Sequence, residues 1–285
     1  MIDNPTKVKD LIKNLANGDS GKAQLLQRRY AMERFLERMA ESEYKNNLVL
    51  KGGMLVTSML DLGQRMTRDT DVTMLDMALD VESTDKMAKA IAAIPLEDSM
   101  TFDVEDAYEI MEDSEYGGVR IEIRAHLGKM DIPMKLDIST GDALTPSAIN
   151  YTYRLMLEDR NIGILAYNIE AVLAEKIETM FSRSTLNTRM RDFYDMWALS
   201  NIGADIDYGI LAEGIAATAR TRGHDVSLVN YDLIIDALAN SKDMAALWTR
   251  YQSRNDFAVE ASWEDALGAV RVLCSKANDA GYAHD

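Results

Sequence analysis

The sequence predicts a mixed α/β half followed by an all-helical half. Short strand-like runs alternate with helix-like segments between about residues 45 and 165. From about residue 168 onward, apolar residues recur almost only at helical spacing, and they do so in the first forty or so residues as well. We therefore expect N-terminal helices that pack on the core (1–44), a mixed sheet with flanking helices (45–165) and a C-terminal helical bundle (166–285).

The individual elements follow from local patterns. Apolar runs and strict alternation predict strands at 48–50, 71–75, 102–105, 119–124 and 132–138. Helical spacing with glycine or proline stops predicts helices at 54–62, 80–94, 169–181 and 189–199, and a break at 17–21 divides the N-terminal helical region. Gly128-Lys129 fits a turn, and Pro133 indicates that the strand after it begins at a sheet edge.

Composition argues against several classes of protein. A single cysteine, Cys274, cannot form an internal disulfide, and its apolar helical surroundings predict a buried packing role. No apolar run approaches the ~20 residues of a membrane span, and the first ten residues lack a signal-peptide core, so a cytoplasmic location is expected. Three scattered histidines give little support to a zinc site. A net charge of −16 disfavours a general nucleic-acid sleeve but leaves a local basic groove open.

Gly52 and Gly53 stand between the first predicted strand and the helix that follows. Glycines let the backbone approach a ligand closely, and a helix start offers free N–H groups and the positive end of the helix dipole. Together these features suit a triphosphate. A strand-to-helix turn often needs glycine in any case, so the pair is also explained by structure alone.

Aspartates form the second part of the candidate site. Asp69 and Asp71 are two residues apart at the entrance to a strand, where such residues share a face and repel each other unless a cation lies between them. Asp137, on a later strand, can add a third carboxylate. Oxygen ligands suit Mg²⁺, and two such ions ~3.5–4 Å apart assist an in-line displacement. The alternatives are a solvated acidic turn and a charged strand end; the combination and order of the motifs favour a metal site.

These motifs, with two later ones, resemble the AbiEii/AbiGii nucleotidyltransferase toxins, whose fold belongs to the DNA polymerase β-like superfamily. Lys51-Gly52-Gly53 with Arg65-Met66-Thr67-Arg68-Asp69-Thr70-Asp71-Val72 resembles the first motif of that family, and Lys135-Leu136-Asp137-Ile138 the second. Leu173-Ala174-Glu175-Lys176-Ile177 and Arg191-Asp192-Phe193-Tyr194-Asp195-Met196-Trp197 resemble its two helical motifs. Met54 departs from the family pattern, in which a small hydroxyl residue often follows the glycines.

The resemblance implies a role for each residue of the first two motifs. Asp69 and Asp71 would bind both of two Mg²⁺ ions, with Mn²⁺ as the alternative metal, and Asp137 would join the ion that activates the acceptor hydroxyl. The NTP would be held by Gly52 and Gly53, and the other residues assigned to NTP binding are Lys51, Arg65, Thr67 and Lys176. Arg65 is either a phosphate contact or a strut for the acidic loop, and we favour the strut.

The helical motifs are expected to complete the active site. Lys176 would neutralise phosphate charge as a compact ammonium donor. Asp192 and Asp195, also assigned to catalysis, lie at i and i+3, so one helical face can present both to Lys176 or Arg191. The alternative is that these charges form a structural salt bridge between helices, around core residues such as Phe193.

The activity implied by the resemblance is that of a toxin in a toxin–antitoxin pair with a role in abortive infection and phage defence. It would transfer a nucleoside monophosphate from an NTP to an RNA acceptor, expected to be the 3′ end of tRNA, and a cognate antitoxin would neutralise it. Basic residues that could contact tRNA, unless they are ordinary solvated charges, are Lys22, Arg28, Arg29, Arg34, Arg38, Arg183, Arg189 and Arg191. Two alternatives are a transferase acting on a protein or small-molecule hydroxyl, and a catalytically silent partner-binding module.

Overall fold

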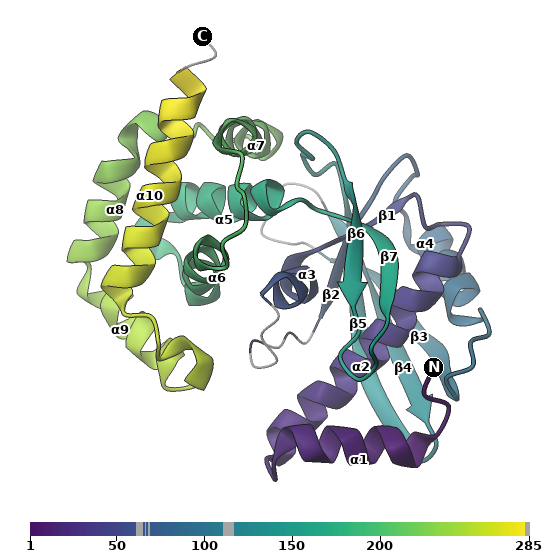
Figure 1. The fold of residues 1–285 in the computed structure, drawn as a ribbon. Helices are drawn as coiled ribbons and strands as arrows, with labels where there is room; N and C mark the ends of the chain where they lie inside the picture. The colour runs from purple at the N-terminus through teal and green to yellow at the C-terminus, as the bar shows by residue number, and fades with distance from the viewer. Residues whose placement is uncertain (61–64, 66, 68, 111–116, 283–285) are drawn as a thin grey trace. The chain divides into compact units, whose positions relative to one another are not determined.

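The computed structural model describes residues 1–60, 65, 67, 69–110 and 117–282 (Figure 1). The chain divides into two compact units. The first combines Met1–Gly141 with Ile149–Ala166, and the second combines Asp142–Ala148 with Tyr167–Asp285. Of the predicted features, the end of the helix at 54–62 and two motif residues, Met66 and Arg68, lie outside the described residues.

The first unit is built around a seven-stranded mixed sheet in the order β3-β4-β5-β2-β1-β7-β6. Its strands are β1 (Leu48–Lys51), β2 (Thr70–Met74), β3 (Met100–Ile110), β4 (Gly118–Leu127), β5 (Met130–Thr140), β6 (Ile149–Arg154) and β7 (Asn161–Ala166). Strand β2 pairs antiparallel to β1 and parallel to β5, and β7 pairs parallel to β1. Strands β3, β4 and β5 form an antiparallel meander.

Alternation along β4 explains why the sheet has one apolar face. Val119, Ile121 and Ile123 are buried, whereas Arg120 and Glu122, which point the other way, are half-exposed. A helical layer covers the apolar face, and the helices of this unit are α1 (Pro5–Ala16), α2 (Ser20–Glu41), α3 (Gly52–Met59) and α4 (Val81–Ala92). Helix α2 packs on β5 and β7, helix α4 packs on β3 and β4, and the two helices contact each other. The opposite face of β4 is therefore a row of charges.

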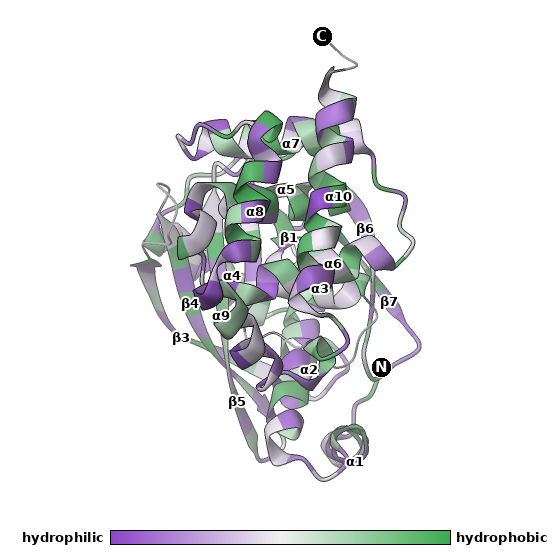
Figure 2. Ribbon diagram, turned by 90° about the vertical axis from the view of Figure 1, so that its left-hand side faces the viewer, coloured by the Kyte–Doolittle hydropathy of each residue, from purple (hydrophilic) through white to green (hydrophobic). Residues whose placement is uncertain are grey.

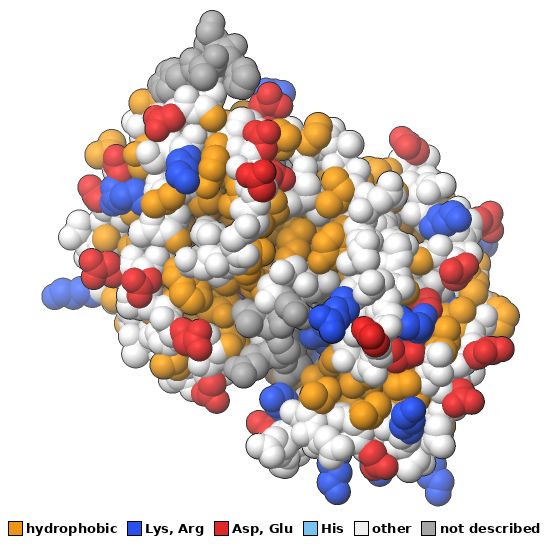
Figure 3. Space-filling view, viewed as in Figure 1, with side chains coloured by type: hydrophobic (Ala, Val, Ile, Leu, Met, Phe, Trp, Pro, Cys, Tyr) orange, Lys and Arg blue, Asp and Glu red, His pale blue; other side chains and the backbone are white. Residues whose placement is uncertain are grey.

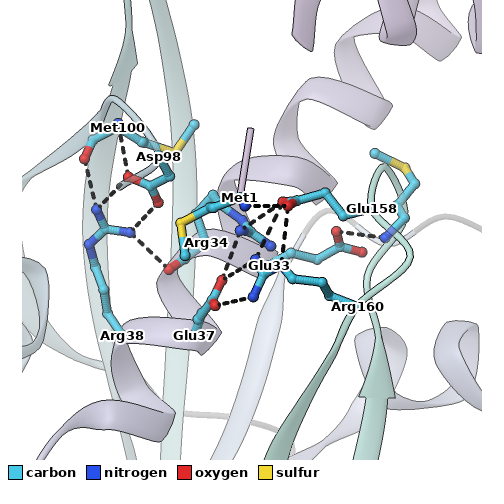
Figure 4. Close-up of polar contacts among 10 residues, drawn as sticks. Met1, Glu33, Arg34, Glu37, Arg38, Asp98, Met100, Glu158 and Arg160 are labelled. Atoms are coloured by element: carbon cyan, nitrogen blue, oxygen red, sulfur yellow. Dashed lines mark hydrogen bonds and ion pairs between the residues drawn. The ribbon is translucent and has the colours of Figure 1, made fainter. Parts of the chain in front are cut away.

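Helix α2 holds an unusual number of buried charges (Figure 4). Arg38, 2% exposed, donates two hydrogen bonds to the Asp98 carboxylate, at 2.7 and 2.9 Å, and a third to the Met100 carbonyl at 2.8 Å. The segment before β3 is therefore tied to α2 by a buried, bidentate ion pair, which is the strongest common form of such a contact.

A second buried ionic cluster ties α2 to the turn between β6 and β7 (Figure 4). Arg34 pairs with Glu37 at 2.8 Å and with Glu158 at 3.1 Å, and Arg160 reaches Glu37 at 2.7 Å. Glu33 is fully buried, and burial raises its pKa although it accepts the Met156 backbone N–H at 3.0 Å. Removing one partner of such a cluster would leave a buried charge unpaired.

The second unit is helical. Its helices are α5 (Ile169–Arg183), α6 (Met190–Asn201), α7 (Tyr208–Thr221), α8 (Tyr231–Asn240), α9 (Lys242–Gln252) and α10 (Trp263–Tyr282). Helix α10 contacts α6, α7 and α8, and the core includes Phe193 packed edge-on against Trp263. Figure 2 shows hydrophilic and hydrophobic residues on both α8 and α10, as expected of helices with one buried face.

The start of α5 is fixed by contacts inside this second unit. The Asn168 side chain accepts the Ala171 N–H at 2.7 Å as an N-cap and donates to the Thr145 carbonyl at 2.9 Å. Thr145 belongs to the short segment Asp142–Ala148, which explains why this segment groups with the helices and not with the sheet that precedes and follows it.

The structure confirms the predicted fold class, a mixed sheet with flanking helices followed by helices. Two strands, β6 and β7, were not predicted. Pro133 lies in β5, which is an interior strand of the sheet. In the part of β5 that contains Pro133, only β4 is paired with it, so the expected sheet edge is present locally. Cys274 is buried in α10, as predicted. In the described part of the chain, no helix is long and apolar enough to span a membrane.

Candidate active site

Gly52 and Gly53 are the first two residues of α3, directly after β1. Gly52 has φ +66°, a conformation that residues with a Cβ rarely adopt. The Gly53 N–H donates to Asp71 Oδ2 at 3.4 Å, and the N-cap residue, Lys51, makes no capping hydrogen bond with its own side chain. A helix start thus faces a carboxylate of the next strand, and its N–H groups are the donors that a phosphate requires.

The buried side chain of Arg65 forms hydrogen bonds with α3. Its side chain is 1% exposed, and Nη1 donates to the Gly53 carbonyl at 2.5 Å and to Thr57 Oγ1 at 3.1 Å. Thr57 in turn donates to the Arg65 carbonyl at 2.6 Å. These bonds hold the helix start in place. The sequence favoured Arg65 as a strut for the acidic loop, and its role there stays a prediction.

Thr67 stands against the second glycine. A Cβ added to Gly53 would lie 2.5 Å from Thr67 Oγ1, so this position has no room for a side chain. The Thr67 hydroxyl donates to the Asp69 carbonyl at 3.3 Å. Asp69, half-buried, comes one residue before β2 begins. The segment that carries the paired aspartates is therefore packed directly on the diglycine.

Pairing across the sheet places five residues with ionisable side chains in a single row. Lys51 on β1 pairs with Asp71 on β2, Asp71 pairs with Asp137 on β5, Asp137 pairs with Arg120 on β4, and Arg120 pairs with Tyr108 on β3. Directly paired residues on neighbouring strands project to the same face of a sheet. Two carboxylates thus lie side by side at the centre of the row, with a basic residue on each flank.

Arg120 binds Asp137 through both carboxylate oxygens. Its Nε lies 2.7 Å from Oδ1 and its Nη2 2.6 Å from Oδ2. This hydrogen bond is the main reason why the pKa of Arg120 is raised above its ordinary value. The Asp137 side chain is 8% exposed and that of Arg120 28%. Both oxygens of Asp137 are therefore engaged by the adjacent guanidinium.

The donor chemistry of this row fits a hard divalent cation. Asp71 and Asp137 offer carboxylate oxygens in register on adjacent strands, next to a helix start, and such oxygens are what Mg²⁺ prefers. Within the described residues, however, no group of three or more His, Cys, Asp or Glu side chains is arranged to hold a metal ion. The trio of Asp69, Asp71 and Asp137 as metal ligands stays a prediction.

The two helical motifs form a separate cluster inside the second unit. Lys176 on α5 lies 2.6 Å from Asp192 Oδ1 and 2.9 Å from Asp195 Oδ2, both on α6. Asp195 is fully buried, and Lys176 and Asp192 are 13% and 15% exposed. The i, i+3 spacing brings both aspartates to Lys176, as predicted. This geometry fits a structural interhelical salt bridge and also fits an ammonium that is held in place for a ligand.

The basic residues considered for RNA binding differ in their surroundings. Arg34 and Arg38 are 0% and 2% exposed and lie in the buried ionic clusters of α2, so the expectation of surface cations is wrong for both. Arg29 pairs with Glu33 at 3.0 Å, and Arg28 donates to the Pro133 carbonyl at 3.0 Å. Lys22, half-buried, is near Arg29 and Arg154 in the lining of a groove of about 800 Å³.

Arg120 and Tyr108 are the members of the row that sequence reasoning missed. The signal for Arg120 was present in the strand that was predicted at 119–124. The strands on either side of the Gly128-Lys129 turn pair Leu127 with Met130, and the same register places Arg120 opposite Asp137.

Comparison with known proteins adds independent findings. No curated protein matches this sequence. Two solved structures from Helicobacter pylori, JHP933 and a candidate nucleotidyltransferase, are each 15% identical, with a TM-score of 0.50 over 92% of this chain and 94% and 98% of theirs. At this identity the likeness shows the fold alone. The family model of the AbiEii nucleotidyl transferase toxins of type IV toxin–antitoxin systems matches residues 34–269. The chain therefore belongs to the AbiEii family and is a nucleotidyltransferase toxin of a type IV toxin–antitoxin system.

Proposed function

We propose that the chain transfers a nucleoside monophosphate from an NTP to the 3′-terminal hydroxyl of a tRNA, with a divalent metal at the aspartates. The acceptor oxygen attacks the α-phosphorus, the bond from that phosphorus to the β-phosphate oxygen breaks, and pyrophosphate leaves. The observation that carries the proposal is the in-register pair of Asp71 and Asp137 beside the Gly52-Gly53 start of α3.

Each part of the row has a role in this proposal. The N–H groups at Gly52 and Gly53 bind β- and γ-phosphate oxygens, because a helix start favours negative charge. Asp71 and Asp137, with Asp69, would hold Mg²⁺ or Mn²⁺. The metal, when bound, supplies positive charge at the reacting phosphate and lowers the pKa of an acceptor hydroxyl. Arg65 and Thr67 keep the glycines and the aspartate segment in contact.

Lys176 is proposed as a phosphate-binding cation, with Asp192 and Asp195 as the residues that hold its ammonium. Support comes from the family motifs and from the distances of 2.6 and 2.9 Å within the second unit. Lys176→Ala should raise the KM for NTP if the ammonium binds phosphate. A purely structural ammonium would lower thermal stability instead, with the KM unchanged.

The choice of tRNA as the acceptor rests on the family resemblance. Lys22, Arg29 and Arg154 line the groove of the first unit, but Glu158 and Asp159 line it as well. A tRNA acceptor implies that the toxin acts in the cytoplasm, and the type IV classification implies an antitoxin partner. The alternatives are transfer to a protein or small-molecule hydroxyl, and a silent binding module.

One assay separates these functions. The protein is incubated with Mg²⁺ and α-labelled NTPs, and total tRNA, a protein extract or buffer is added. Label on tRNA supports the proposal, and label on protein or on a small molecule supports the other acceptors. No label, together with no metal-dependent NTP binding, would support the silent module.

Variants test the site itself. Asp71→Asn and Asp69→Ala should each lower transfer by about a hundredfold or more, because a metal-held charge contributes several kcal/mol to the transition state. Asp131→Asn is the matched control, because Asp131 lies on β5 as Asp137 does but is 64% exposed and outside the row. Unchanged transfer in Asp71→Asn would reject the metal-site assignment.

A further inference from the structure

The ion pair between Arg120 and Asp137 conflicts with metal binding at Asp137. A divalent cation needs at least one oxygen of that carboxylate, yet Arg120 donates a hydrogen bond to each oxygen, at 2.7 and 2.6 Å. A guanidinium fork that matches a carboxylate in this way is a strong, directional contact. Metal and Arg120 therefore compete for the same lone pairs.

The surroundings of Asp137 distinguish this pair from an ordinary cross-strand ion pair. On the same face of β4, Arg124 binds Glu105 with the same bidentate geometry, at 2.5 and 3.0 Å, but both side chains are 38% exposed. Asp137 is 8% exposed and pairs in register with a second carboxylate, Asp71. A nearly buried carboxylate beside a second, half-buried one requires a counter-charge.

We propose that Arg120 is a displaceable counter-ion, which neutralises Asp137 in the metal-free chain and must release it before a divalent cation binds there. The inference rests on the proposed function, because it takes Asp137 as a metal ligand. In the metal-free chain, Arg120 offsets the repulsion of Asp137 by Asp71 from one side of the row, as Lys51 flanks Asp71 on the other. The same contact lowers the affinity of the site for metal, because a metal ion has to displace Arg120 before it can bind Asp137.

The side chain of Arg120 has the freedom that such an exchange requires. It is 28% exposed and projects from the charged face of β4, whereas Arg65 and Arg38 are almost fully buried. Its neighbours are Tyr108 across the β3 register and Glu122, two residues along the same face, which accepts the Tyr108 hydroxyl at 3.0 Å. A released guanidinium therefore stays beside an acidic side chain and water.

The test measures metal binding directly, without activity. Full-length protein is titrated with Mn²⁺, and free Mn²⁺ is read from its electron paramagnetic resonance signal. Arg120→Gln should bind Mn²⁺ about tenfold more tightly than the wild type, the worth of a charge-assisted hydrogen-bonded pair. Arg124→Gln, which removes the matched pair on the same strand, should leave the affinity unchanged. Arg120→Lys, which keeps the charge but not the fork, should fall between wild type and Arg120→Gln.

A second measurement compares the thermal stability of the variants without and with metal. Without metal, Arg120→Gln should melt at a lower temperature than the wild type, and saturating Mn²⁺ should raise its melting temperature by more than that of the wild type. If Arg120→Gln does not fold, Arg120→Lys carries the test, and equal affinity of that variant and the wild type would overturn the inference.

Asp137→Asn separates this inference from the proposed function. If Asp137→Asn weakens Mn²⁺ binding but Arg120→Gln binds no more tightly than the wild type, Arg120 is not a competitor and only this inference fails. If Asp137→Asn has no effect on Mn²⁺ binding and Arg120→Gln gains none, the metal site itself is absent and both fail.

Discussion

At Gly52, a backbone requirement and a contact of the candidate site coincide in one residue. The φ of +66° favours glycine, and a Cβ at this position would lie 2.1 Å from Asp71 Oδ2 and 2.8 Å from its Cγ. Any other residue must therefore move the Asp71 carboxylate as well as adopt a strained backbone. The sequence indicated a close backbone approach at this glycine but not that the approaching group is the aspartate.

Gly52→Ala should therefore lower both stability and transfer. We expect a loss of about 1–2 kcal/mol in the free energy of unfolding from the left-handed backbone alone. Transfer should fall further than stability explains, because Asp71 is displaced. Urea denaturation and the labelled-NTP assay measure the two effects. Gly163→Ala in β7, where an added Cβ meets no atom within 4 Å, is the control. Full transfer by Gly52→Ala would show that the position of Asp71 does not matter.

The elements differ in how much of them the sequence could predict. Strand β4 was predicted because its apolar and charged residues alternate over a long run, with a turn signal after it. Strand β6 was missed because most of its side chains are exposed or half-exposed, with Tyr153 alone fully buried, so alternation is weak. The pairing of β1 with β7 joins segments more than a hundred residues apart, and no local pattern encodes it.

The candidate site shows the same division. Motif order indicated Gly52, Asp71 and Asp137, and the i, i+3 spacing brought Asp192 and Asp195 to Lys176 as predicted. Arg34 and Arg38 were misjudged because helical charges are usually solvated. Here Arg34 has a carboxylate partner 124 residues away, and Arg38 has one 60 residues away. Burial of a charge depends on tertiary pairing, which composition does not reveal.

His126 joins three strands on the charged face and should make their packing depend on pH. It lies between Asp131 on β5, at 2.7 Å, and Asp103 on β3, at 3.0 Å. The hydrogen bond to Asp131, followed by that to Asp103, raises the pKa of His126 above 6.5. The stabilisation is therefore complete below pH 6.5 and is lost as pH rises through the folded-state pKa.

His126→Asn should accordingly melt at a lower temperature than the wild type near pH 6, with a gap that closes in more alkaline buffer. The gap should be small, because Asp103 and Asp131 are 75% and 64% exposed and water screens the pair. Melting curves across pH measure it, and imidazole resonances in NMR give the pKa directly. A gap that widens as pH rises would contradict this assignment.

At the scale of the whole molecule, acidic residues outnumber basic ones by 47 to 31, which gives the net charge of −16. The visible face in Figure 3 shows acidic and basic side chains interspersed among hydrophobic ones over the surface. Several basic residues already form ion pairs within the fold, as in the pairs Arg38–Asp98 and Arg120–Asp137. With a net charge of this size, the acidic side chains repel one another on average, and this repulsion destabilises the compact folded state.

The chain should therefore become more stable when monovalent salt is added. Between about 10 mM and 100 mM, the screening length falls from roughly 30 to 10 Å, which weakens long-range repulsion but hardly touches buried pairs such as Arg38–Asp98. Melting temperature is measured in increasing KCl, with a chelator present so that no divalent ion contributes. Glu213→Gln, at an exposed acidic position on α7, should raise the low-salt melting temperature and reduce the salt effect. A melting temperature that falls with salt would mean that attraction between surface pairs outweighs the net charge.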